Sequence, residues 1–173
     1  ERIRSSATRR SAIRVRIADR APTHTNPVLM LADRLVLLAG GRLTASEVLD
    51  LARSAPVRRR FGLHDDDLDR LTDWIAAVVI RWGLDAEHRE AYRLRDLTQN
   101  TWRAGLDRIL VGAAIDGEDV DNVGTTLGLD DLDSGDIDLA GRLAELVARL
   151  GATIEAMHEA VTAKDWVEVL REG

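Results

Sequence analysis

The chain contains no cysteine among its 173 residues. Disulfide bonds, a thiolate nucleophile and cysteine-ligated zinc or iron–sulfur centres are therefore excluded, and this composition is typical of the reducing cytoplasm. No run of about 18 apolar residues occurs and no signal peptide opens the sequence, which argues against a membrane span or export. We therefore expect a cytoplasmic protein without a membrane partner.

The residue patterns of common catalytic sites are also missing. There is no glycine-rich phosphate loop, dinucleotide-binding turn or nucleophile elbow. The four histidines lack the helical spacing of a metal site: His24, His64, His88 and His158. A faint calcium-loop pattern from Asp131 has Asp136 in place of the required glycine and Arg142 in place of the glutamate. We predict no catalytic residue, cofactor site or metal site in this segment.

Charge is distributed unevenly along the chain. Residues 1–20 carry seven arginines against two acids, whereas residues 115–138 carry nine acids and no base. The net charge of −6 is unusual for a nucleic-acid module that works alone, because phosphate neutralisation supplies most non-specific affinity. We interpret 115–138 as an acidic, solvated loop that repels DNA.

The segment from Ile13 to Ala18 alternates apolar and polar residues, which favours a β-strand with one buried face. No partner strand is evident in the sequence, so its ladder hydrogen bonds are expected to form outside this chain. The first residue is Glu1 and not methionine, which also favours a piece of a larger protein.

From Asn26 onward the apolar residues recur at helical spacing. Asn26 and Pro27 predict a helix start, and Gly40 its end. Thr44 and Glu47 form a capping box for a helix over 45–53, with Leu43 placed to contact Val48. Further helices are predicted over 56–60 and about 65–82, the latter with Val79 on its inner face, followed by a brief helix from Asp85 to Tyr92. A helix over about 100–113 has Leu110 directed inward. A long apolar stripe from Leu139 to Val161 and a short helix around Trp166 complete the prediction.

The predicted fold is therefore an all-α helical bundle preceded by one β-strand. One possible function is an independent helix-turn-helix DNA-binding module, with Arg58, Arg59 and Arg60 on a short recognition helix. Alternatively these arginines are solvated or pair with the acids at 65–69. A bundle that binds only proteins is a third possibility.

Several blocks follow one another in a specific order. They are Leu43–Leu51, Arg60-Phe61, Ile80–Asp85 with its Arg-Trp-Gly, and Thr101–Leu106 with its Thr-Trp-Arg, followed by Arg108 and Gly112. This order closely resembles the RecC family, the gamma subunit of the RecBCD helicase-nuclease, also called exodeoxyribonuclease V. In addition, Ile17–Arg20 followed by Asn26–Val28 is similar to the point where a RecA-like motor domain of superfamily 1 enters its helical 2B insertion.

The resemblance implies that residues 1–25 are a basic arm and a strand of an adjoining RecA-like domain. Residues 26–173 are then the helical 2B-like domain. It also implies RecB-like and RecD-like partner subunits, double-stranded DNA ends and unwound single strands as partners. The implied function is non-catalytic support of DNA unwinding, strand channelling and Chi-regulated end resection in double-strand-break repair and recombination.

Residues able to bind phosphate or stack on a base are the candidate DNA contacts. They are Arg14, Arg16, Arg58, Arg59, Arg60, Arg81, Trp82, Trp102 and Arg103. For Trp82 and Trp102 the alternative is packing between helices, and for Arg81 and Arg103 it is an ion pair with Asp85 or Asp107.

Overall fold

The computed structural model describes residues 26–114, 128–129, 132 and 134–172. The expected strand at Ile13–Ala18, with Arg14 and Arg16, lies outside these residues, as does most of the acidic segment. The described residues form α1 (Pro27–Ala39), α2 (Ala45–Ala52), α3 (Ala55–Phe61), α4 (Asp65–Ala77), η2 (His88–Tyr92), α5 (Trp102–Ala114), η3 (Ser134–Asp136), α6 (Ile137–Glu159) and α7 (Ala163–Glu172). The all-α prediction is confirmed for this part of the chain.

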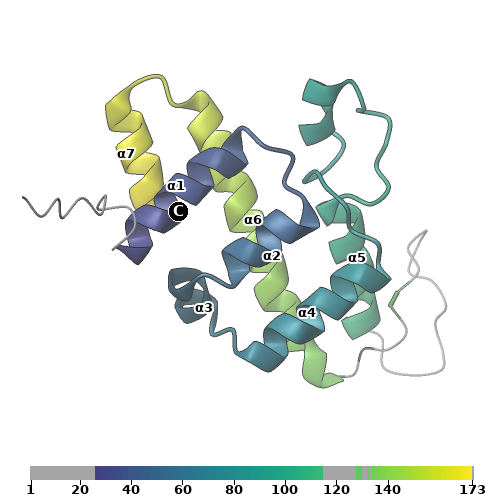
Figure 1. Cartoon of the computed structure of the whole chain (residues 1–173). Coiled ribbons are helices and arrows are strands. Elements are labelled where there is room, and N and C mark those ends of the chain that lie inside the picture. The colour runs from purple at the N-terminus through teal and green to yellow at the C-terminus, as the bar shows by residue number, and fades with distance from the viewer. Residues whose placement is uncertain (1–25, 115–127, 130–131, 133, 173) are drawn as a thin grey trace, which may run out of the picture.

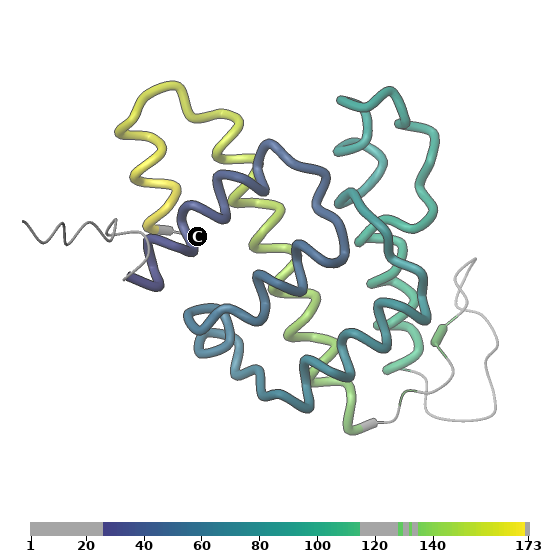
Figure 2. Tube along the Cα trace, in the orientation of Figure 1, coloured from purple at the N-terminus to yellow at the C-terminus, as the bar shows by residue number. Residues whose placement is uncertain are grey.

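The long helix α6 is the centre of the domain. It runs through the middle of the molecule and contacts α1, α5, α7 and η3 (Figures 1 and 2). Nine of its residues are buried, spaced three or four apart along most of its length, so one face of the helix supplies much of the core. None of the described helices combines the length and apolar character that a membrane span needs.

The helix starts follow the local sequence signals. The Asn26 side chain accepts a hydrogen bond from the Val28 N–H at 2.9 Å, and Pro27 occupies the first turn of α1. The Thr44 and Glu47 side chains form the expected capping box on α2. These short-range signals are satisfied within four residues, so tertiary packing does not override them.

The end of α4 differs from the prediction. The helix stops at Ala77 and does not continue toward Gly83. The Ile80 N–H donates to the Ile75 carbonyl at 3.0 Å and the Val79 N–H donates to the Ala76 carbonyl, which is the Schellman pattern. Val79 takes the left-handed position of this motif at φ 59°, where glycine is usual.

Three apolar residues expected on inner faces are exposed. Val79 is turned outward by the helix end, and Leu110 lies on the outer side of α5. Val161 follows the end of α6 at Glu159 and is 90% exposed, so the buried stripe ends with Met157. In each case the helical spacing predicts an inner position for a residue that lies beyond the end of the helix or outside the face that other helices cover.

The end of the acidic segment is not a solvated loop, contrary to the prediction. Residues 134–138 form η3 and the start of α6. Asp136 is buried, and its carboxylate accepts a hydrogen bond from Arg70 of α4 at 2.5 Å. The pair therefore joins segments that lie 66 residues apart in the chain.

A second charged contact joins α6 to the start of α4. The Arg142 guanidinium donates to the Gly62 carbonyl at 2.7 Å and lies 3.4 Å from the Asp67 carboxylate. Burial raises the pKa of Asp67, but the hydrogen bond from the His64 N–H and the nearby Arg142 charge outweigh burial and lower that pKa below its ordinary value. Asp67 therefore stays ionised as a structural acid.

Replacing Asp67 by asparagine is expected to destabilise the domain by about 1–2 kcal/mol at pH 7, because the charge-assisted interaction with Arg142 is removed. Since folding lowers the pKa of Asp67, its contribution is present above the unfolded pKa, near 3.8, and is lost as the pH falls through the folded pKa. Urea denaturation at pH 7, 5, 4 and 3 should show the difference between parent and variant shrinking below about pH 4.

Asp66→Asn removes an exposed carboxylate from the same helical turn and is the matched control for charge at the helix N-terminus. A deficit in Asp67→Asn that is unchanged between pH 7 and pH 3 would contradict the proposed role of its ionised form.

Candidate interaction surface around Trp82 and Trp102

Three chain segments meet beside the C-terminal end of α4. We call the segments 40–45, 78–84 and 100–103 the junction. The Arg81 carbonyl accepts from the Ala45 N–H, and the Asn100 carbonyl accepts from the Arg81 N–H, each at 2.9 Å. The Gly83 carbonyl accepts from the Trp102 N–H, also at 2.9 Å. The Arg-Trp-Gly and Thr-Trp-Arg blocks of the sequence are therefore paired through their backbones.

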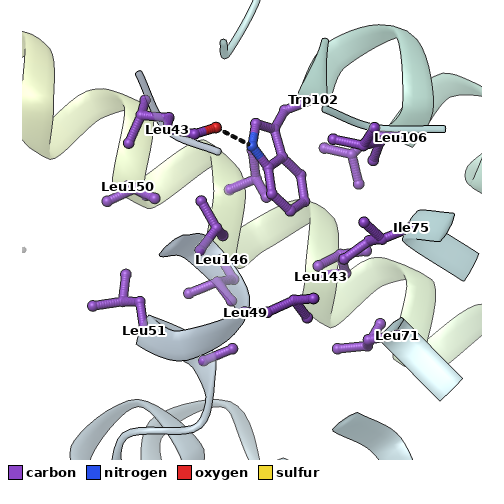
Figure 3. Close-up of a cluster of buried hydrophobic side chains, with 14 of the residues drawn as sticks. Leu43, Leu49, Leu51, Leu71, Ile75, Trp102, Leu106, Leu143, Leu146 and Leu150 are labelled. Atoms are coloured by element: carbon purple, nitrogen blue, oxygen red, sulfur yellow. Dashed lines mark hydrogen bonds between the residues drawn. The ribbon is translucent and has the colours of Figure 1, made fainter. Parts of the chain in front are cut away.

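Trp102 lies in the core of the junction. Its side chain is 0% exposed, and its indole N–H donates to the Leu43 carbonyl at 2.9 Å. Figure 3 shows the ring among leucines of α2, α4, α5 and α6. Trp102 is thereby removed from the candidate DNA contacts, because a base cannot reach its ring in this conformation. The packing role is the one the structure shows.

Trp82 is half-buried between charged and aromatic neighbours. The Arg89 guanidinium lies 4.5 Å from its ring centroid, that of Arg42 lies 5.6 Å away, and the Tyr92 ring meets it edge-on at 5.3 Å. These distances are those of cation–π and aromatic pairs. The ring contacts that a base would need are thus largely made within the domain.

Arg89 holds the segment between Trp82 and Asn100 in place. Its guanidinium donates to the carbonyls of Leu97 at 2.6 Å, Gln99 at 2.8 Å and Trp82 at 2.7 Å. The residue is 4% exposed, and burial lowers the pKa of its guanidinium. The sequence did not predict a role for Arg89, because no residue pattern distinguishes it from Arg93, an exposed arginine four residues later.

Gly83 is part of the same arrangement. As a glycine, it is the sequence signal that could have indicated the buried Arg89. Its φ is 82°, and a Cβ there would lie 2.9 Å from the Arg89 Nε. Only glycine combines this backbone conformation with so close an approach. The glycine of the Arg-Trp-Gly block thus makes room for a buried arginine.

Arg81 and Arg103 lie at the surface of the junction. The Arg103 Nε is 3.7 Å from the Asp85 carboxylate, and 75% of the Arg103 side chain is exposed, so this ion pair is weak. Of the two roles predicted for Arg103, the structure shows the carboxylate contact. Arg81 is exposed, and the described residues offer its guanidinium no ion pair.

The three arginines of α3 have different surroundings. Arg58 pairs with Asp65 at 2.8 Å and donates to the Leu63 carbonyl, as the structural alternative predicted. Arg59 and Arg60 are exposed, without an ion pair to the described residues. Arg59 borders an open hollow of about 420 Å³, which is also lined by Ala55, Arg58, Gly62, Leu63 and His64.

The geometry of α3 does not favour a helix-turn-helix reader. The helix has seven residues, its Val57 is buried, and its Arg58 is held by Asp65 of the following helix. Three carboxylates, Asp65–Asp67, occupy the first turn of α4 beside it. A recognition helix needs several side chains on one free face, whereas here only Arg59 and Arg60 are available.

The exposed candidates fall into two groups along the chain. Arg59 and Arg60 precede the start of α4, whereas Arg81 follows its end and lies in the junction with Arg103. The 13 residues of α4, about 20 Å long, lie between the two groups in the sequence. Among the residues whose positions are known, no group of three or more acids and histidines is arranged to hold a metal ion.

These features define a helical domain whose charged and aromatic side chains chiefly join its own segments. The chain belongs to the RecC family: residues 25–173 match the family model described as the fourth domain of the RecBCD enzyme subunit RecC.

Proteins similar to this chain are named as the RecBCD enzyme subunit RecC. The chain is 50% identical over 161 residues to the RecBCD enzyme subunit RecC of Mycolicibacterium smegmatis, and 47% identical to that of Mycobacterium tuberculosis. It is 28% identical over 156 residues to that of Escherichia coli. These alignments cover 90–93% of the chain but only 14–15% of each relative. The chain thus spans about one seventh of the length of these proteins.

Proposed function

We propose that this chain is a non-catalytic domain of a RecC-like subunit that supports DNA unwinding, strand channelling and Chi-regulated end resection. The observation that carries the proposal is the match of residues 25–173 to one domain of RecC. The internal use of three arginines adds support: Arg70 and Arg142 join α4 to η3 and α6, and Arg89 anchors the segment 82–100. A rigid domain of this kind suits a scaffold on which motors and DNA strands are arranged.

The proposed partners are RecB-like and RecD-like subunits, together with double-stranded DNA ends and unwound single strands. The relatives are named as subunits of a RecBCD enzyme, and a subunit acts within its assembly. We assign ATP-dependent helicase and exonuclease activity to the assembled enzyme in the cytoplasm. The domain itself is assigned no cofactor.

Within the described residues, Arg59, Arg60 and Arg81 are the best candidates for contact with DNA phosphates. Each is exposed, and each lacks an ion pair to the part of the chain that the structure describes. A guanidinium free of carboxylates can release counterions from DNA, which contributes affinity that falls with salt. Arg14 and Arg16 remain candidates from the N-terminal arm.

We expect Arg59→Ala/Arg60→Ala in the full-length subunit, assembled with its partners, to weaken binding to blunt duplex ends by about three- to tenfold at low salt. The slope of log affinity against log salt concentration should fall by about one for each phosphate that the variant no longer neutralises. Fluorescence anisotropy at several salt concentrations measures both quantities, and Arg81→Ala tests the second group separately.

Arg171→Ala is the matched control, because Arg171 is an exposed arginine on α7. Normal assembly with unchanged affinity and salt slope in all the variants would exclude these DNA contacts and leave a domain that binds only proteins. Sequence-selective duplex binding by the subunit alone, abolished in Arg59→Ala/Arg60→Ala, would instead favour the helix-turn-helix alternative.

A further inference from the structure

A second cation lies beside the Trp82 ring, in addition to the buried Arg89. Arg42 belongs to the loop between α1 and α2, and its guanidinium lies 5.6 Å from the Trp82 ring centroid and 5.3 Å from that of Tyr92. The planes of these two rings meet at 81°. The Arg42 guanidinium is therefore within cation–π distance of two nearly perpendicular rings at once.

The rings hold the Arg42 side chain without using its hydrogen-bonding groups. Arg42 is exposed, and the described part of the chain offers its guanidinium neither an ion pair nor a hydrogen bond. A guanidinium carries five N–H donors, and its attraction to an aromatic ring needs none of them. Because the rings already restrict the side chain, less conformational entropy is lost when an anion binds to it.

The positive charge around Arg42 is larger than its own. The junction contains three arginines and no acid, in a chain of net charge −6: Arg42, Arg81 and Arg103. The buried Arg89 guanidinium lies 4.5 Å from the Trp82 centroid and is bound by three carbonyls. Arg42 and Arg89 are therefore within about 10 Å of each other, which is about one Debye length at 0.1 M salt. An anion bound at Arg42 is attracted by both charges.

Nearby acids do not cancel this charge. The segment 85–99 carries four acids and three arginines, so the junction together with this segment keeps a net charge of +2. Glu47, the nearest acid along the chain from Arg42, is bound to Thr44 in the capping box. The Arg42 guanidinium is thus available to an anion from outside the domain.

We propose that Arg42 contacts a DNA phosphate and that Trp82 and Tyr92 hold its guanidinium in position. This inference rests on the proposed function, because it names a side chain through which the domain binds DNA. Phosphate oxygens accept charge-assisted, bidentate hydrogen bonds from a guanidinium, and a polyanion gains more from the surrounding positive charge than a single carboxylate does. Since the contact is to the DNA backbone, it is independent of base sequence.

Tyr92 is a positioning residue in this arrangement. Its ring lies beside the Arg42 guanidinium, and its hydroxyl donates to the Gly41 carbonyl at 3.0 Å. The tyrosine therefore fixes both the side chain of Arg42 and the backbone next to it. Removing the tyrosine leaves the charge of Arg42 in place but lets the guanidinium move, so the affinity and the salt dependence of DNA binding should respond differently.

The first test replaces Arg42 in the full-length subunit, assembled with its partners. Arg42→Met should weaken DNA binding about three- to tenfold at low salt and lower the slope of log affinity against log salt concentration by about one. Arg42→Lys keeps the charge, so its slope should match the parent while its affinity lies between those of Met and Arg. Fluorescence anisotropy with a blunt duplex and with a single-stranded oligonucleotide measures both quantities. The DNA on which Arg42→Met loses affinity is the one that supplies the phosphate.

Arg93→Met is the matched control, because Arg93 is an exposed arginine next to Tyr92 that makes no cation–π contact with the described residues. Its affinity should stay within about twofold of the parent. Tyr92→Leu should weaken binding about two- to threefold without changing the salt slope, and it should add no further loss to Arg42→Met. A purely structural role of Arg42 would lower thermal stability and leave the affinity and the salt slope unchanged.

Parent-like affinity and slope in Arg42→Met on both DNAs, or equal losses in Arg42→Met and Arg93→Met, would overturn the inference. Impaired assembly with unchanged DNA affinity would also overturn it and would assign Arg42 to a carboxylate of a partner subunit. If Arg81→Ala weakens DNA binding and Arg42→Met does not, this inference fails while the proposed function stands. If neither of them nor Arg59→Ala/Arg60→Ala changes binding, the DNA contacts of the proposed function fail as well.

Discussion

Replacing Arg89 by methionine is expected to destabilise the domain by about 3 kcal/mol, because three carbonyl groups lose their donors at once. Methionine retains an unbranched apolar side chain, so the loss reports mainly on the hydrogen bonds to Trp82, Leu97 and Gln99. Urea denaturation followed by circular dichroism measures the change in unfolding free energy. Arg93→Met, an exposed arginine of the same segment, is the control and should change stability by less than about 0.5 kcal/mol.

Lysine is not expected to rescue position 89. An ammonium group lacks the planar fork that reaches three carbonyls in different directions and stacks on the Trp82 ring at 4.5 Å. Hydrogen exchange should show faster exchange across 82–100 in both variants, with α6 little changed. Arg89→Lys at full stability, or exchange that rises equally throughout the domain, would contradict the role of Arg89 as a local clamp.

The elements that the sequence predicts well are those with local signals. The caps at Asn26 and Thr44 bond within three residues of themselves, so the pattern and the structure agree. The end of α4 has no such signal. Its Schellman motif places Val79 where glycine is usual, and burial of Ile75 and Ile80 on either side offsets the strained backbone.

The contacts of the candidate site depend on residues far apart in the chain, which explains why sequence reasoning found only some of them. The Arg-Trp-Gly and Thr-Trp-Arg blocks drew attention to the tryptophans, but no spacing shows that Trp102 bonds to Leu43, 59 residues away. Likewise Asp136 belonged to a run of acids, and only the fold shows its contact with Arg70. Composition predicts that the acids of this run are solvated as a group, whereas the fold buries Asp136 alone among those that the structure describes in detail.

Replacing Trp102 by alanine is expected to destabilise the domain more than any other single substitution proposed above, by about 3–5 kcal/mol. The side chain is 0% exposed and its removal leaves a cavity among α2, α4, α5 and α6 that these helices cannot close without moving. Trp102→Phe separates the two contributions of the indole. It keeps most of the apolar contact but removes the N–H that bonds the Leu43 carbonyl, so a decrease of about 1–2 kcal/mol is expected.

The Leu43 backbone makes this hydrogen bond unusually important. Leu43 has φ 55°, a left-handed conformation that a leucine adopts at a cost, and its side chain is 0% exposed. The indole donor therefore holds a strained residue at the point where α1 passes into α2. Thermal denaturation of Trp102→Phe, compared with Trp166→Phe on the partly buried α7, tests this interpretation. If Trp102→Phe matched the parent in stability while Trp102→Ala was destabilised by several kcal/mol, packing alone would account for Trp102 and the hydrogen bond to Leu43 would carry no stabilising role.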